Sequence, residues 1–197
     1  MRHRVLLVGA VAVVLAVVAG GGALFWRALP YRVPVDQPVR AQSVAREMAY
    51  VHRWWDGRNP EFGSWVGTDC VNFTSQALLA RGWRMDADWG TSTTLGRRAS
   101  APAWVSSTAM MRLLEHRPDL ATAVSATEVR VGDVAQFDWD GSGDRDHTAV
   151  VSDVERGDGV PRVYVAEHSP SGLHDFVAAR LAENGPRARV YYWRLSG

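Results

Sequence analysis

The only cysteine of the chain lies in the segment Asp69-Cys70-Val71-Asn72-Phe73-Thr74-Ser75-Gln76-Ala77-Leu78-Leu79-Ala80-Arg81-Gly82. Asp69 is a preferred helix N-cap residue and Gly82 a preferred residue after a helix, so the stretch predicts a helix over 70–81. Cys70 then lies in the first turn, where unpaired N–H groups and the helix dipole lower the pKa of a thiol. This environment is typical of a cysteine nucleophile. The alternative is a small buried core residue, because unpaired cysteines are often buried.

The N-terminal segment has the character of an export signal. Residues 5–26 carry no charged side chain, and arginines flank the run on both sides. As a helix the run measures about 33 Å, enough for a hydrocarbon core of about 30 Å. We expect a signal anchor or, alternatively, a signal peptide cleaved near 19–23. Both place the rest of the chain outside the cytoplasm, in a single-pass membrane protein or a secreted one. Exported proteins usually contain cysteines in disulfide-bonded pairs, so the lone Cys70 favours a thiol with a chemical role.

The expected organisation is a signal segment at 1–27, a proline-containing tether at 28–41 and one domain at 42–197. The formal net charge is +1 and the charges are well mixed. The mixed charges leave no stripe of basic residues that would indicate a nucleic-acid-binding protein. We expect a monomer that needs no cofactor and contacts the membrane through residues 5–26.

Apolar spacing predicts the fold class. Residues 36–55 and 107–116 have helical patterns, and the first contains an apolar stripe through Val44, Met48 and Val51. Short runs rich in Val, Tyr, Phe and Trp follow, and these are typical of strands: 133–139, 147–154, 162–168 and 189–193. Helices followed by antiparallel strands predict an α+β fold.

Two histidines are placed to act with the thiol. His147 opens a predicted strand and shares a face with Ala149 and Val151, which are apolar and expected to point at the helices. There His147 would serve as a base for Cys70. His168 ends the next strand, from which it would orient the His147 ring. Alternatively, the His147 side chain only forms hydrogen bonds with the acidic turn before it, and His168 is a surface residue.

Four sequence blocks carry a resemblance. They are residues 69–78, Val131-Gly132-Asp133-Val134-Ala135-Gln136-Phe137, Asp146-His147-Thr148-Ala149-Val150-Val151, and His168. With them, residues 42–195 resemble the bacterial putative amidase domain family, of the papain-like group that includes CHAP and NlpC-type cell-wall hydrolases. Trp89 and Trp104 also match the family pattern, whereas Thr74 stands where valine is expected.

The resemblance implies a papain-like fold, in which N-terminal helices carrying the nucleophile pack on a small antiparallel sheet. It also implies a nucleophile at Cys70, a base at His147 and a polar residue that orients the base. His168 is the first candidate for this third position, and Asn72 and Asp146 are weaker ones.

Two further features concern ligands. Trp65, Trp89 and Trp104 are candidate walls of a substrate cleft, and the alternative for them is the hydrophobic core. Residues 138–144 resemble the start of a calcium loop, but Ala149 occupies its twelfth position in place of glutamate. An acidic hairpin turn explains this segment more simply, so we expect no metal.

Together these features predict an extracytoplasmic cysteine amidase or peptidase that hydrolyses amide bonds through a Cys70 acyl-enzyme. The resemblance alone implies that the substrate is cell-wall peptide or a similar peptide. The alternatives are an acyl transferase that uses the same Cys/His pair, and a non-catalytic papain-like module that binds wall peptide.

Overall fold

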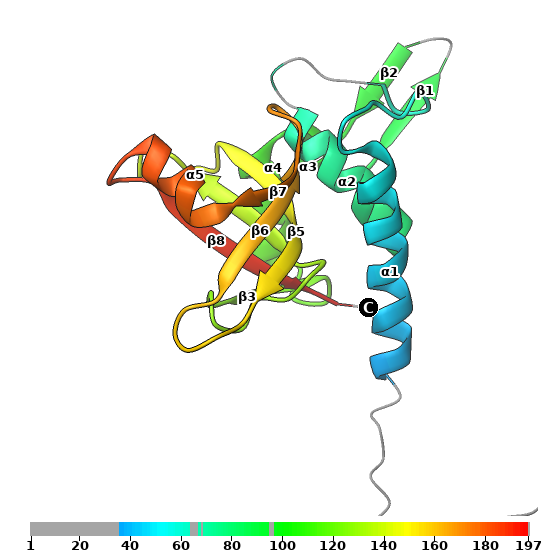
Figure 1. Cartoon of the computed structure of the whole chain (residues 1–197). Coiled ribbons are helices and arrows are strands. Elements are labelled where there is room, and N and C mark those ends of the chain that lie inside the picture. The colour runs from blue at the N-terminus through cyan, green and yellow to red at the C-terminus, as the bar shows by residue number, and fades with distance from the viewer. Residues whose placement is uncertain (1–35, 64–66, 68, 95–96, 197) are drawn as a thin grey trace, which may run out of the picture. The chain divides into compact units, whose positions relative to one another are not determined.

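Helices come first along the chain and strands dominate its second half (Figure 1). Figure 1 shows the computed structural model, which describes residues 36–63, 67, 69–94 and 97–196. The elements are α1 (Asp36–Trp54), α2 (Asp69–Arg81), β1 (Thr91–Thr94), β2 (Arg97–Ser100), α3 (Pro102–Val105), α4 (Ser107–His116), β3 (Ala121–Val124), β4 (Val134–Asp138), β5 (His147–Glu155), β6 (Arg162–Glu167), β7 (Gly172–Phe176), α5 (Val177–Asn184) and β8 (Arg189–Leu195). The predicted α+β class is confirmed.

The strands form two antiparallel sheets. The small one pairs β1 with β2, and the larger one has the order β3-β8-β4-β5-β6-β7. Each of the four predicted strands is present and lies in the larger sheet. The pattern did not reveal β3 and β7, two short strands at the edges of that sheet, or the short hairpin of β1 and β2.

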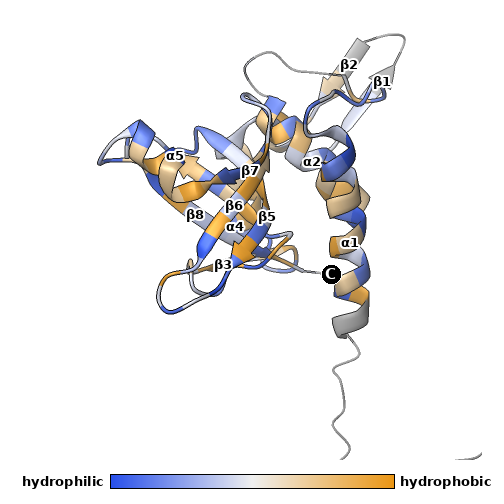
Figure 2. Cartoon of the chain, viewed as in Figure 1, coloured by the Kyte–Doolittle hydropathy of each residue, from blue (hydrophilic) through white to orange (hydrophobic). Residues whose placement is uncertain are grey.

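Apolar residues are frequent along the strands of the larger sheet (Figure 2), and they belong to separate core clusters on its two faces. Val150 and Ala166 pack with Val51, Phe73 and Ala77, on the face covered by α1 and α2. The other face collects a second cluster, to which α5 contributes Val177; its strand residues include Ala135, Phe137, Ala149, Val151, Val163 and Val165. The expectation that Ala149 and Val151 point at the helices is therefore wrong. Both faces of the sheet are buried, so apolar character alone does not identify the helical side.

The helix that carries Cys70 is buried on nearly every side. It contacts α1, α3, α4 and the strands β5 and β6. Its buried residues include polar ones, among them Asn72, Ser75 and Gln76. The predicted end of the helix is confirmed: Gly82 has a φ of 122° and its N–H donates to the carbonyls of Leu78 and Leu79. A helix enclosed in this way holds its first turn in a fixed position.

Expectations for the N-terminal part fall mostly outside the described residues, which include neither 1–35 nor Trp65. Among the described residues, no helix has the length and apolar character needed to span a bilayer. The helix predicted over 36–55 is confirmed as α1. Residues 36–41 of the expected tether therefore belong to this helix, which begins at Asp36.

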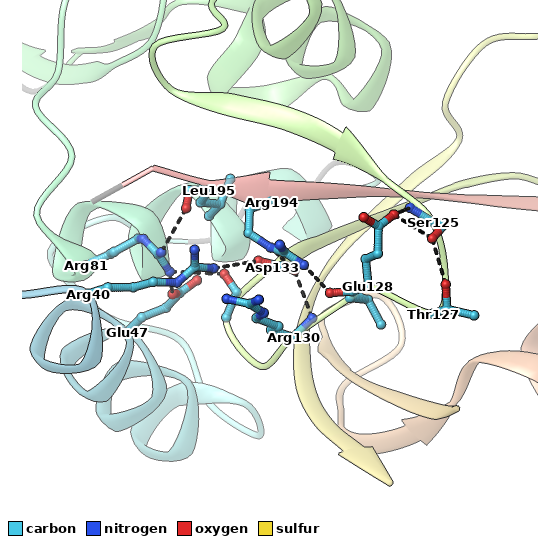
Figure 3. Close-up of polar contacts among 12 residues, drawn as sticks. Arg40, Glu47, Arg81, Ser125, Thr127, Glu128, Arg130, Asp133, Arg194 and Leu195 are labelled. Atoms are coloured by element: carbon cyan, nitrogen blue, oxygen red, sulfur yellow. Dashed lines mark hydrogen bonds and ion pairs between the residues drawn. The ribbon is translucent and has the colours of Figure 1, made fainter. Parts of the chain in front are cut away.

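A buried network of charges joins α1, α2 and the larger sheet (Figure 3). Arg81 in α2 and Glu47 in α1 are 2.5 Å apart and almost fully buried. Arg81 also donates to the carbonyls of Gly132 and Leu195. Gly132 has a φ of 80°, and a Cβ there would lie 2.9 Å from the Glu47 carboxylate. Only glycine therefore lets the chain pass this close to the ion pair.

Asp133 extends the network to further arginines. Its carboxylate lies 3.3 Å from Arg40 in α1 and 3.3 Å from Arg194 in β8, and it accepts the backbone N–H of Arg130. The Gly132-Asp133 pair that carries part of the family resemblance thus anchors α1 and α2 to the sheet. The network fixes the C-terminal end of the helix whose N-terminal end carries Cys70.

Candidate active site

Cys70 lies in the first turn of α2 and is 5% exposed. Its Sγ is 3.9 Å from the Oγ of Ser107, the first residue of α4. The His147 side chain and the backbone of Thr148, both at the start of β5, lie close enough to Cys70 to lower the pKa of its thiol. Three elements distant in sequence therefore converge on the sulfur.

The surroundings of Cys70 favour its thiolate. Burial raises the pKa of the thiol, but the hydrogen bond and the positive charge of His147 act against it, as do hydrogen bonds from Thr148 and Ser107. The net result is a pKa below the ordinary value of a cysteine. A thiolate is the form of cysteine that acts as a nucleophile.

His147 is held between Cys70 and a carboxylate. Its Nε2 lies 2.5 Å from the Oε2 of Glu167, which leaves Nδ1 for Cys70. The rings of Phe137 and Trp139 lie beside the imidazole. Burial alone would lower the pKa of His147, but Cys70 and Glu167 raise it to about 9. At pH values above the lowered pKa of Cys70 and below about 9, the pair is a thiolate facing an imidazolium.

Glu167 occupies the third position that His168 was predicted to hold, and sequence reasoning missed it. It is the last residue of β6 and is fully buried. Its other oxygen, Oε1, lies 3.1 Å from the Nε of Arg180 in α5. Asp175 in β7 also contacts it, and burial together with the Glu167 charge raises the pKa of Asp175. Glu167 is therefore a fixed acceptor for the imidazole N–H.

Strand alternation explains why the predicted orienting role of His168 is wrong. Glu167 shares a face with Val163 and Val165, which pack in the same cluster as Ala149 and Val151. His147 belongs to that face as well. His168 follows on the opposite face, where it stacks on Phe73 of α2 at 4.0 Å. In the sequence, Glu167 follows Val163 and Val165 at a spacing of two residues. This spacing indicates a carboxylate on a buried face of the strand, and it is the signal by which Glu167 could have been found.

His168 instead supports the beginning of α2. Its Nδ1 lies 2.9 Å from Asp69 Oδ2 and its Nε2 lies 2.8 Å from the carbonyl of Trp54. Asp69 also forms an ion pair with Arg58 and accepts a hydrogen bond from Asn72. These contacts tie the residue that precedes the cysteine to α1 and to the end of β6.

The weaker candidates for the third position are also engaged elsewhere. Asn72 accepts from the indole of Trp104 and donates to Asp69. Asp146 accepts the backbone N–H of Trp139. These contacts belong to the core and to the turn before β5.

Trp89 and Trp104 do not form the walls of a cleft at Cys70. They are 2% and 0% exposed, and both pack in the core between α2, α3 and α4. Their indole N–H groups donate to Ser75 and Asn72 of α2. A buried indole N–H needs a hydrogen-bond acceptor, and a side chain of α2 supplies one to each ring. Both tryptophans therefore help to hold in place the helix that carries Cys70.

The acidic segment before His147 forms a turn. The Asp138 carboxylate accepts backbone N–H groups from Gly141, Ser142 and Gly143. Carboxylate oxygens of Asp138, Asp140 and Asp146 lie within 4.8 Å of one another. Asp138 uses its oxygens on the backbone, which is the arrangement of a tight hairpin turn.

Comparison with known proteins agrees with the sequence blocks. Residues 41–193 match the putative amidase domain family. The uncharacterized protein YhbB of Bacillus subtilis (strain 168) is 29% identical over 113 residues, covering 55% of this chain and 36% of YhbB. The chain thus spans little more than a third of the length of that curated relative. No solved structure matches the chain at a significant level. Because the family match extends over most of the chain, the protein belongs to the putative amidase domain family.

Proposed function

We propose that the protein is a cysteine-dependent amidase or peptidase of the papain-like type. The observation that carries the proposal is the arrangement of Cys70, His147 and Glu167. A thiol at a helix start, an imidazole in contact with it and a carboxylate behind the imidazole are the three groups that nucleophilic acyl transfer requires. All three are buried on rigid elements, so their geometry is preorganised.

The first half of the reaction forms an acyl-enzyme. The Cys70 thiolate attacks the amide carbonyl carbon, and the carbonyl oxygen gains the negative charge. The backbone N–H of Cys70, in the first turn of α2, is available to donate to that oxygen. His147 then gives its proton to the leaving nitrogen, the C–N bond breaks, and the amine leaves.

The second half regenerates the thiolate. Neutral His147 takes a proton from water, which attacks the thioester carbon and releases the carboxylic acid. Glu167 keeps the imidazole oriented and stabilises its positive charge in both halves. The same acyl-enzyme would serve a transferase if an amine replaced water, and product analysis with added amine distinguishes the two.

We further propose that the substrate is cell-wall peptide and that the domain works outside the cytoplasm. The support is the apolar segment at residues 5–26 and the resemblance of the sequence blocks to cell-wall hydrolases. Incubation of the full-length chain with purified peptidoglycan, followed by mass spectrometry of the released fragments, identifies the bond that is cut.

The pH dependence of Cys70 alkylation by iodoacetamide tests the pair directly. In the full-length chain we expect the rate to rise with a midpoint well below the free-cysteine value of about 8.5. In His147→Ala the midpoint moves up by about 1–3 units, because an imidazolium close to the thiolate is lost.

The control is His116→Ala, since His116 is exposed at the end of α4 and bonded to its own helix. This variant is expected to titrate like the wild type. An ordinary thiol midpoint in the wild type would contradict the nucleophile assignment and would favour a module that binds wall peptide without catalysis.

Glu167→Gln tests the third residue. The variant keeps the shape of the side chain but removes the negative charge behind His147. We expect kcat/KM to fall about 10²–10⁴-fold. Glu167 raises the pKa of His147, so its loss lowers that pKa. The alkaline limb of the pH–rate profile, where imidazolium is lost, should therefore move below about 9.

Glu155→Gln is the matched control, because Glu155 is an exposed carboxylate on β5. Its activity and pH profile should equal those of the wild type. If Glu167→Gln retained the wild-type alkaline limb, Glu167 would have no part in setting the charge of His147.

A further inference from the structure

A continuous row of buried polar side chains ends at the sulfur of Cys70. The Nε1 of Trp193 lies 2.9 Å from Gln136 Oε1. The Nε2 of Gln136 lies 3.2 Å from the hydroxyl of Thr148, and this hydroxyl lies 2.9 Å from that of Ser107. The Ser107 hydroxyl is the one 3.9 Å from Cys70 Sγ. Gln136 and Thr148 are fully buried, and Ser107 is 6% exposed.

The directions of the hydrogen bonds in the row follow from the chemistry of Trp193 and Gln136, from the donation of Thr148 to Ser107, and from the thiolate form of Cys70, which can only accept. An indole N–H only donates, so Trp193 must face the amide oxygen of Gln136. The amide nitrogen of Gln136 then donates to Thr148 and to the carbonyl of Ser107, which is 2.9 Å away. Thr148 has accepted one bond, and its own proton goes to Ser107. The Ser107 proton is left to point at the sulfur.

We propose that Ser107 is a catalytic residue that donates a hydrogen bond to the Cys70 thiolate, and that Thr148 and Gln136 are positioning residues that hold its proton on the sulfur. The side chains of Gln136, Thr148 and Ser107 together are called the hydroxyl relay. The inference rests on the proposed role of Cys70 as the nucleophile and assigns the sulfur a side-chain donor that is independent of His147.

The fold keeps the relay in place. Gln136 and Thr148 are directly opposed residues of the antiparallel pair β4 and β5. Ser107 opens α4, and the preceding Ser106 caps the helix by accepting the N–H of Ala109. The relay therefore connects two neighbouring strands to a helix start, and none of its members needs to move for the thiolate to form.

The relay acts on a sulfur with one charged neighbour among the described residues that contact it. From β5 that neighbour is His147, and from α4 the contact is the neutral Ser107 hydroxyl. Asp69, which precedes Cys70 on α2, directs its carboxylate to Arg58, Asn72 and His168. A hydrogen bond to a charged acceptor is about twice as strong as one between neutral groups. The relay consequently favours the thiolate over the neutral thiol.

The test is the alkylation midpoint of Cys70 in relay variants of the full-length chain, with thiolate absorbance as a second measure. In Ser107→Ala the midpoint should rise by about one pH unit, which makes alkylation below the wild-type midpoint about tenfold slower. Thr148→Val keeps Ser107 but no longer orients its proton, so a smaller rise is expected. Thr148→Ser restores the hydroxyl and should restore the wild-type midpoint.

Ser75→Ala is the matched control. Ser75 is a fully buried serine of α2 that accepts from Trp89 and is not part of the relay. It should lower stability without moving the midpoint. A wild-type midpoint in both Ser107→Ala and Thr148→Val would overturn the relay, and so would an equal rise in Ser75→Ala. If the wild-type chain itself titrated like free cysteine, the proposed function would fail instead, so the two failures are distinct.

Discussion

Replacement of Cys70 by alanine is expected to lower kcat/KM for amide hydrolysis by at least about 10⁴-fold, because no other side chain replaces the nucleophile in the acyl-enzyme. The fold should persist. Cys70 is one small residue of a core that also contains Trp104, Met110 and Leu114, so loss of its sulfur costs about 1 kcal/mol of the free energy of unfolding.

His147→Ala should have an effect of similar size on turnover. It removes the group that raises thiolate occupancy and protonates the leaving amine. Glu167 keeps its ion pair with Arg180 in this variant, so its charge stays compensated and the domain stays folded.

The measurement is the release of new amino groups from peptidoglycan by each full-length variant, with circular dichroism as the check on folding. His116→Ala serves as the histidine control and should be fully active. Activity of Cys70→Ala close to that of the wild type would exclude the cysteine mechanism. Loss of activity together with loss of the far-ultraviolet spectrum would show an effect on folding and would call for the isosteric Cys70→Ser.

Arg81→Ala is expected to destabilise the domain by about 3–5 kcal/mol. The substitution leaves Glu47 buried without its partner and removes the donor to the carbonyls of Gly132 and Leu195. A loss of this size is a large share of the total stability of a typical domain, about 5–15 kcal/mol. Urea unfolding followed by tryptophan fluorescence measures it.

The double variant Glu47→Leu/Arg81→Met should be more stable than Arg81→Ala alone, because neither charge remains buried. The control is Arg162→Ala, which breaks the exposed ion pair with Glu155 and should cost no more than about 1 kcal/mol. A loss below about 1 kcal/mol in Arg81→Ala would mean that α1 and α2 hold to the sheet without this network.

Local patterns in the sequence were enough to predict most of the architecture. The helices over 36–55, 70–81 and 107–116 and four strands of the larger sheet are present close to their expected bounds. Periodicity and capping residues act within one or two turns of chain, so they can be recognised without tertiary contacts. Strand β3 has only four residues, and β7 begins with a glycine and contains His174 and Asp175, so neither carries a clear run of strand-forming residues.

The proposed nucleophile and the proposed base were also predictable, because each stands at the start of an element with a recognisable pattern. The lone Cys70 at a helix start and His147 at a strand start required only local chemistry. That the two side chains meet is a property of the packed structure, in which α2 lies against β5.

Local sequence patterns are thus sufficient to predict the α+β class, the helix that carries Cys70 and the strand that begins with His147. The tertiary structure decided which groups surround them: it put Glu167 behind His147, turned His168 toward Asp69, buried Trp89 and Trp104, and brought Ser107 to the sulfur. The physical reason is that both faces of the larger sheet are buried. When apolar residues line both faces, strand alternation tells which residues share a face but not which face meets the helices, and only packing settles that choice.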